Sequence, residues 1–163
     1  MIFLRAVPEG WSFRRFEVRG GDGAVVGSVD LSNWRESAEI EVGGGRYRAV
    51  HGALRKDFVL SREDGGVVLA VEKPSAFRDR FYFEHDGHYE LRKESAWGRA
   101  FELRRDGTGA VGSLRPEGMF RRSWTAELPD DLSPEVCVFL IWLAILLDRR
   151  AAAGGAAAVS AGF

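Results

Sequence analysis

The sequence predicts a mainly β protein, an antiparallel barrel of about twelve strands that encloses one hydrophobic C-terminal helix. Three observations support this fold. Residues 136–147 form an unbroken apolar stretch, tight-turn sequences recur at nearly even spacing before it, and apolar and polar residues alternate between those turns. A helix that is apolar on every side must be surrounded by protein or by lipid. A closed barrel that is wide enough supplies such an interior.

The apolar stretch has the length and the ends of a buried helix. As a helix, residues 136–147 would span about 18 Å, which is too short for a hydrocarbon core of about 30 Å. Ser133 suits the N-cap and Pro134 the first helical position, while Arg149 and Arg150 suit the C-terminal end. A buried strand is the rival interpretation, because Val, Ile, Phe and Trp are frequent here, but buried strands usually run about 4–8 residues.

We therefore expect a core helix over about 134–149. The Ala- and Gly-rich tail at 151–163 could extend that helix by a turn before it frays. The large side chains that we expect in the core are Phe139, Trp142, Leu143 and Leu146.

Tight-turn sequences divide the chain before the helix into hairpins. Asp-Gly pairs begin at Asp22, Asp64, Asp86 and Asp106, and a triple glycine occupies 43–45. These residues supply the positive φ that hairpin turns require. Five hairpins give ten strands, and one strand near 3–7 and another near 122–128 bring the total to about twelve.

The segments between the turns alternate as half-buried strands do. Phe16 and Val18 are interleaved with charged residues, and so are Phe101 and Leu103. Residues 16–29 also align without a gap to residues 101–114, which indicates either two related halves or the general similarity of hairpins. The runner-up fold is a lipocalin-like barrel with an outer helix, but an outer helix should be amphipathic.

Composition sets broad limits on the protein. With 163 residues, 45% of them hydrophobic, we expect a single domain over 1–150. The net charge of −1 predicts no bulk attraction to nucleic acid. Cys137, the single cysteine, lies in the apolar stretch and should be a buried thiol. The N-terminal segment has neither the basic nor the apolar region of a signal peptide, so we expect a soluble, cytoplasmic protein without a membrane span.

The sequence resembles the tubby C-terminal-like superfamily, in particular its LURP-one-related and phospholipid-scramblase-like branch. The resemblance is carried by the FEVRGGDGAVVG hairpin at 16–27, its echo at 101–112 and the ending VFLIWLAILLDRR at 138–150. It extends over about residues 3–150 and implies a twelve-stranded barrel threaded by a hydrophobic helix. It also implies roles that range from phosphoinositide binding and membrane association to defence signalling, so the fold does not determine the function.

Two functional features that the resemblance implies can be compared residue by residue. Tubby proteins carry a Lys-x-Arg pair after a hairpin glycine that binds inositol phosphates. If Gly27 is that glycine, Ser28 and Asp30 occupy those positions and the basic pair is absent. Scramblase-like proteins are linked to calcium through an acidic segment near the helix. Asp130 and Asp131 lie there, but without a calcium-loop motif their simpler role is to favour the helix N-terminus.

Catalytic, cofactor and metal motifs are not evident in the sequence. His85 and His88 flank a turn and could contact a metal, but a surface turn is the simpler interpretation. Cys137 lacks the exposed, electropositive surroundings of a nucleophile. We therefore predict no catalytic residues, no metal and no cofactor.

Basic residues recur along the chain, and some of them could form an anion site. Acidic residues are interspersed, so a mixed-charge surface is the simpler interpretation, and a patch for anionic lipid or phosphate is the alternative. The residues that we select as a candidate anion site are Arg46, Arg48, Arg55 and Lys56.

Three functions remain open from the sequence. The leading one is a non-enzymatic binding or scaffold module, because a barrel filled by its own helix has no large interior pocket. Peripheral binding to anionic phospholipid or phosphoinositide membranes is the alternative, and a protein partner is also compatible with the first hypothesis. An enzyme is the third, since active sites can assemble from residues far apart in sequence.

Overall fold

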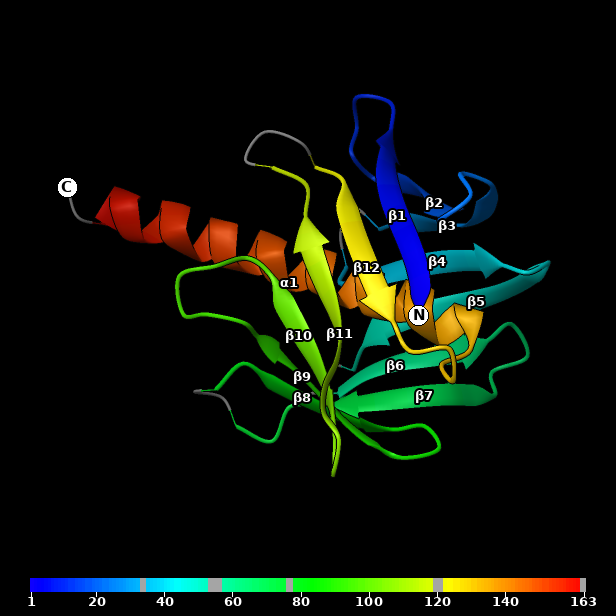
Figure 1. Cartoon of the computed structure of the whole chain (residues 1–163). Helices are drawn as coiled ribbons and strands as arrows, with labels where there is room; N and C mark the ends of the chain where they lie inside the picture. The colour runs from blue at the N-terminus through cyan, green and yellow to red at the C-terminus, as the bar shows by residue number, and fades with distance from the viewer. Residues whose placement is uncertain (33–34, 53–56, 76–77, 119–121, 162–163) are drawn as a thin grey trace.

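The protein folds as a closed barrel of twelve antiparallel strands around one helix, as a computed structural model shows (Figure 1). The structure describes residues 1–32, 35–52, 57–75, 78–118 and 122–161. Each strand pairs with its neighbour in sequence, and β1 pairs with β12 to close the barrel. The elements are β1 Ile2–Glu9, β2 Arg15–Gly20, β3 Val25–Leu31, β4 Ser37–Val42, β5 Gly45–His51, β6 Asp57–Arg62, β7 Val67–Glu72, β8 Arg80–Glu84, β9 His88–Lys93, β10 Phe101–Arg105, β11 Gly109–Pro116, β12 Trp124–Leu128 and α1 Pro134–Ala161.

The predicted barrel, its strand number and all five predicted hairpin turns are confirmed. Each turn lies between two paired strands, from β2–β3 to β10–β11. Gly23, Gly65 and Gly107 have positive φ values of 84°, 91° and 74°, which a residue with a Cβ rarely adopts. The turn sequences thus fix where the chain reverses.

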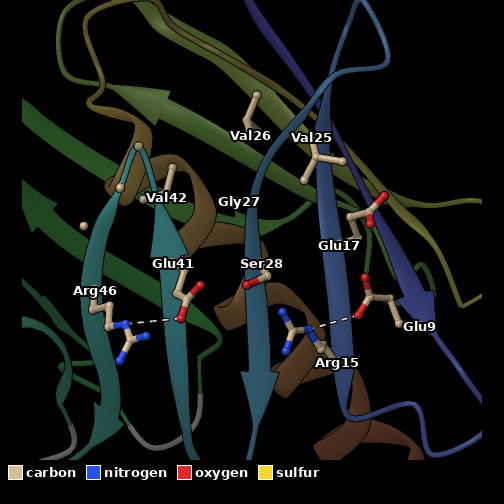
Figure 2. Close-up of a pocket in the computed structure, with 13 residues that line it drawn as sticks. Glu9, Arg15, Glu17, Val25, Val26, Gly27, Ser28, Glu41, Val42 and Arg46 are labelled. Atoms are coloured by element: carbon tan, nitrogen blue, oxygen red, sulfur yellow. Dashed lines mark ion pairs between the residues drawn. The ribbon is translucent and has the colours of Figure 1, made fainter.

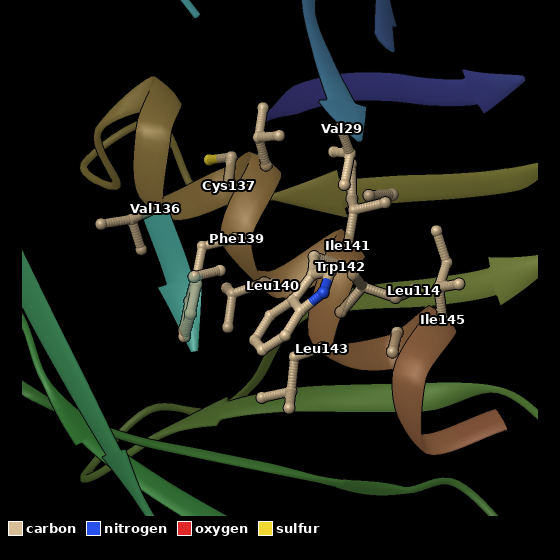
Figure 3. Packing of buried hydrophobic residues seen from close by; sticks show 14 of the residues in the cluster. Val29, Leu114, Val136, Cys137, Phe139, Leu140, Ile141, Trp142, Leu143 and Ile145 are labelled. Carbon is tan, nitrogen blue, oxygen red and sulfur yellow. The ribbon is translucent and has the colours of Figure 1, made fainter. Parts of the chain in front are cut away.

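The helix α1 fills the barrel interior. Every side chain from Val136 to Ile145 is at most 2% exposed. Figure 3 shows the Trp142 indole and Leu143 projecting from the helix toward the surrounding strands. The Phe139 and Trp142 rings lie 5.4 Å apart, and the Phe58 ring of β6 meets Trp142 edge-on at 6.2 Å. Core residues of this kind contribute about 1.5–3 kcal/mol each through burial of apolar surface.

Three details of the helix differ from the expectation. Leu146 is only partly buried, because the helix leaves the barrel there. The helix continues to Ala161 instead of ending near 149, since alanine has the highest helix propensity and no proline interrupts the tail. Ser133 occupies the N-cap position and its carbonyl accepts the Cys137 amide at 3.1 Å, but its hydroxyl has no hydrogen-bond partner among the described residues.

The predicted repeat has a structural counterpart. The hairpins β2–β3 and β10–β11 carry a register shift at the same place, after Val18 and after Leu103. The structure also brings out a third copy at 58–71, the hairpin β6–β7, where the register shifts after Leu60. The three hairpins are four strands apart around the barrel, so the fold has approximate threefold repetition.

Two repeat glycines bring neighbouring strands together. A Cβ at Gly27 of β3 would lie 2.4 Å from the Glu41 carbonyl oxygen of β4, and a Cβ at Gly112 of β11 would lie 2.6 Å from the Glu127 carbonyl oxygen of β12. Real Cβ atoms do not approach backbone oxygens this closely. The strand pairs β3–β4 and β11–β12 therefore depend on glycine at these positions.

We expect Gly27→Ala to lower the free energy of unfolding by about 1–3 kcal/mol, because the new methyl group must push β4 away. Urea unfolding followed by circular dichroism measures the change. Gly154→Ala is the matched control, because its Cβ meets nothing within 4 Å in the exposed part of α1 and should stabilise the helix slightly. Equal stability of Gly27→Ala and the parent protein would contradict the close approach of β3 and β4.

Candidate functional site

The predicted anion site lies in part beside a groove on the outer face of β2 to β5. Gly27 and Ser28 of β3 lie in this groove, which has a volume of about 500 Å³ and is also lined by Glu41 and Arg46 (Figure 2). Ser28 lies on the outward side of β3, whereas the buried Val29 and Leu31 lie on the inward side. Ser28 therefore contributes to the floor of a surface groove.

Charges in this groove are balanced. Figure 2 shows Arg46 beside Glu41 and Arg15 beside Glu9, at nitrogen-to-oxygen distances of 3.3 and 2.9 Å. The Arg46 and Glu41 side chains are 66% and 55% exposed, so their ion pair adds about 0–1 kcal/mol. The groove thus has no surplus of positive charge with which to attract an anion.

The structure separates the four predicted anion-binding residues. Arg46 and Arg48 are exposed on β5, directly opposite Glu41 and Glu39 of β4. A carboxylate in the opposing cross-strand position offsets each guanidinium charge. Arg55 and Lys56 lie outside the described residues. The anion site at these four residues therefore stays a prediction.

The two ends of the barrel differ sharply in charge. Because neighbouring strands are antiparallel, alternate connections lie at opposite ends. One end of the barrel is where α1 begins, and we call it the acidic end. It holds the connections that include 21–24, 63–66, 85–87, 106–108 and 129–133. Their charged residues are Asp22, Glu63, Asp64, Asp86, Asp106, Asp130 and Asp131.

We call the opposite end, where α1 leaves the barrel, the tryptophan end. Its described connecting segments are 10–14, 32, 35–36, 52, 73–75, 78–79, 94–100, 117–118 and 122–123. Trp11 and Trp97 are 95% and 98% exposed there, although tryptophan is usually well buried. The basic residues of these segments are Arg14, Arg35, Lys73, Arg78, Arg99 and Arg122, and the acidic ones are Glu36, Asp79, Glu94 and Glu117.

Contacts from α1 hold the tryptophan end in place. Arg149 donates a hydrogen bond to the Phe13 carbonyl, and the Arg122 guanidinium lies 4.0 Å from the centre of the Phe13 ring. Phe13 has a φ of 52°, which is uncommon for a bulky residue, and these two arginines hold it in that conformation. Arg99 pairs with Asp148 through two hydrogen bonds of 2.8 and 2.7 Å.

Arg150 connects the helix to the β3–β4 connection and to the end of β5. Its guanidinium forms an ion pair with Glu36 and lies 3.2 Å from the His51 ring nitrogen Nδ1. Burial lowers the pKa of the Arg149 and Arg150 side chains below the ordinary arginine value, and the positive charge of Arg122 adds to the effect on Arg149. The connections β1–β2 and β3–β4 are thus attached to the helix through charged groups.

The acidic end holds the start of the helix through its aspartates. Asp130 accepts a hydrogen bond from the N-terminal ammonium at 2.7 Å. Asp131 accepts one from the Tyr89 hydroxyl at 2.9 Å and one from Arg105 at 2.8 Å. Burial and this bond to Asp131 raise the pKa of Tyr89. These contacts give both aspartates a role within the fold, at the positive end of the helix dipole.

The described residues form no cluster of three or more His, Cys, Asp or Glu side chains that could hold a metal ion. His88 instead pairs with Glu84 at 3.0 Å across the hairpin turn. Cys137 is 0% exposed, and burial, followed by the charge of Glu135, raises its pKa from 9.0 to about 12. A protonated, buried thiol cannot act as a nucleophile near neutral pH.

Comparison with known proteins adds information about the fold alone. The chain is similar to a protein from Arabidopsis thaliana of known crystal structure, with 91% of each chain covered, a TM-score of 0.56 and 13% sequence identity. An identity this low shows a shared architecture and carries no function. No family model and no curated protein matches the sequence. In the part of the chain that is described, no helix combines the length and apolar character needed to cross a membrane.

We expect the Cys137 thiol to resist labelling by a disulfide reagent in the native protein at pH 8, and to react fully in urea. The raised pKa favours the protonated thiol in the folded state. Its contribution to stability is therefore complete below pH 9 and is lost as the pH rises toward about 12. Absorbance of the released reagent measures labelling, with Cys137→Ala as the blank. Native labelling at the unfolded rate would contradict the buried position.

Proposed function

We propose that this protein is a non-enzymatic binding module that acts through its outer surface. The observation that supports this proposal is the filled interior, where Phe139, Trp142 and Leu143 are 0% exposed. Small-molecule and cofactor sites are usually deep apolar cavities, and here the helix occupies the centre of the barrel. The proposal includes membership of the LURP-one-related branch of tubby-like proteins, which rests on the sequence motifs at 16–27, 101–112 and 138–150.

A thermal-shift screen of the purified protein tests the non-enzymatic role. We expect no increase in melting temperature with nucleotides, flavins, nicotinamides or small metabolites, because the helix fills the interior where such ligands would bind. The screen would detect a bound ligand, since a ligand at 100 times its Kd stabilises a protein by about 2.7 kcal/mol. Any stabilising compound is then incubated with the protein and followed by mass spectrometry. A small molecule that both stabilises the protein and is chemically converted by it would contradict the proposal.

Peripheral binding to anionic membranes is the second candidate, and the tryptophan end favours it. Tryptophan is enriched at membrane–water interfaces, where its ring lies among lipid headgroups. Arg14, Arg35 and Arg78 form no ion pair with a described residue, so their charges are available to anionic lipid. The acidic end would then face away from the membrane, which reduces repulsion.

Vesicle co-sedimentation tests this second candidate. We expect the protein to bind vesicles of phosphatidylserine and phosphatidylcholine at low salt, and not phosphatidylcholine alone. Arg14→Gln combined with Arg35→Gln should weaken binding about thirtyfold, since each basic residue near an anionic surface contributes about 1 kcal/mol. Trp11→Ala combined with Trp97→Ala should also weaken it without loss of stability, because both rings are almost fully exposed.

Arg46→Gln combined with Arg48→Gln is the matched control for charge. These residues lie on the side of the barrel, so this variant should bind vesicles as the parent protein does. If only this variant loses binding, the β5 site predicted from the sequence is the lipid site and the tryptophan end is not. If no anionic vesicle binds the parent protein at low salt, the membrane candidate is excluded.

A further inference from the structure

The seam between β7 and β8 is the weakest in the barrel. These strands share one paired position, Glu72 with Tyr82, whereas each of the other neighbouring strand pairs shares at least four. Glu72 is the last residue of β7, so the contact lies toward the tryptophan end. From there the two strands are unpaired as far as the acidic end of the barrel.

A sequence difference between the three repeats explains this opening. Leu69 of β7 occupies the position that Gly27 holds in β3 and Gly112 holds in β11, as the register with the preceding strand shows. The two glycines admit a carbonyl oxygen of the next strand where a Cβ would be. Leu69 has a side chain and is 2% exposed in the core, so β8 cannot approach β7 in the same way.

The opening leaves backbone groups without a strand partner. Backbone amides and carbonyls along a strand point alternately to its two sides. The edge of β7 that faces β6 is paired along the whole strand, from Asp57–Glu72 to Ser61–Val67. On the side that faces β8, the groups of β7 before Glu72 have no strand partner among the described residues. Such an edge is a template for another extended chain.

A cleft of about 690 Å³ lies at this opening, within the size range of ligand sites. Apolar surface comes from Val67 and Tyr82, which are 62% and 38% exposed. The charged residues that line the cleft are Glu72, Glu84, Glu90 and Asp106, together with His88. Carboxylates therefore dominate the cleft, in contrast to the balanced groove beside Arg46.

Glu90 has an incompletely satisfied carboxylate in this cleft. Its buried Oε1 atom has no hydrogen-bond partner among the described residues. The nearest cationic nitrogens, on Arg80 and Arg92, are 3.7 and 4.0 Å away, too far for a hydrogen bond. The Glu90 side chain is 21% exposed, so a cationic donor in the cleft can approach this carboxylate beside the two arginines.

We propose that the β7–β8 cleft binds an extended peptide segment rich in Lys or Arg, which adds as a strand to the free edge of β7. Main-chain hydrogen bonds to β7 would supply sequence-independent affinity, and alternate cationic side chains would reach Glu84 and Glu90. The exposed face of Tyr82 can accept a cation over its ring. This inference rests on the proposed role as a binding module and specifies a protein partner for it.

The test uses the full chain and a capped octapeptide of alternating lysine and valine as the probe. We expect saturable binding by fluorescence anisotropy at low salt, with amide protection from hydrogen exchange gained in residues 67–71. The same peptide with alternate amides N-methylated should not bind, because it lacks main-chain donors, and a glutamate–valine octapeptide should not bind, because the cleft is acidic. Glu84→Gln combined with Glu90→Gln should weaken binding about fivefold or more, while circular dichroism stays unchanged.

Three outcomes would overturn this inference. They are no binding of the lysine–valine peptide, equal binding by the Glu84→Gln and Glu90→Gln variant, and new protection that maps away from β7. Trp11→Ala combined with Trp97→Ala should leave peptide binding intact, because these rings lie outside the cleft. Failure of the peptide experiment therefore removes the cleft as a site, whereas the vesicle and thermal-shift experiments decide the proposed function separately.

Discussion

Burial of an entirely apolar helix is the constraint on which this structure depends. The side chains from Val136 to Ile145 are excluded from solvent, and here a closed sheet covers the helix on all sides. The inward residues of every strand in turn need the helix, because without it the barrel would enclose a large void. The two parts thus stabilise each other, and neither forms a complete core alone. Trp142 shows that apolar burial dominates over hydrogen bonding here. Its buried indole nitrogen has no hydrogen-bond partner among the described residues, and apolar contacts of the ring outweigh the energy of the missing hydrogen bond.

The two barrel ends carry opposite charge along the helix. Aspartates gather where α1 begins, which favours the positive end of the helix dipole, and arginines gather where the helix leaves the barrel, well before its end at Ala161. Individual ion pairs such as Arg99–Asp148 are partly exposed and add little energy each. Their effect is geometric, because Asp148, Arg149 and Arg150 tie separate connections to one helix. The same asymmetry places basic and aromatic groups together at one end of the molecule.

Structural features that depend on residues close together in the sequence could be predicted from the sequence. The five turns, the strand alternation and the buried helix each follow from neighbouring residues, and all three are confirmed. The pairing of Arg46 with Glu41 was also within reach, because a turn at 43–44 sets that cross-strand register. The convergence of Trp11 and Trp97 at one end was not, since it depends on closure of the barrel. The helix end at Ala161 was missed because a low-complexity tail was expected to fray.

The β7–β8 opening shows how repetition and its failure can locate a site. A pair of glycines at equivalent positions indicates a shared packing requirement, namely room for a neighbouring carbonyl oxygen. Where the third repeat has Leu69 instead, that requirement cannot be met, and the barrel remains joined there by one paired position. A closed barrel normally protects its edges from other chains. One seam without this protection, lined by carboxylates and exposed apolar side chains, is therefore where a second polypeptide can pair with this one at the least cost to the fold.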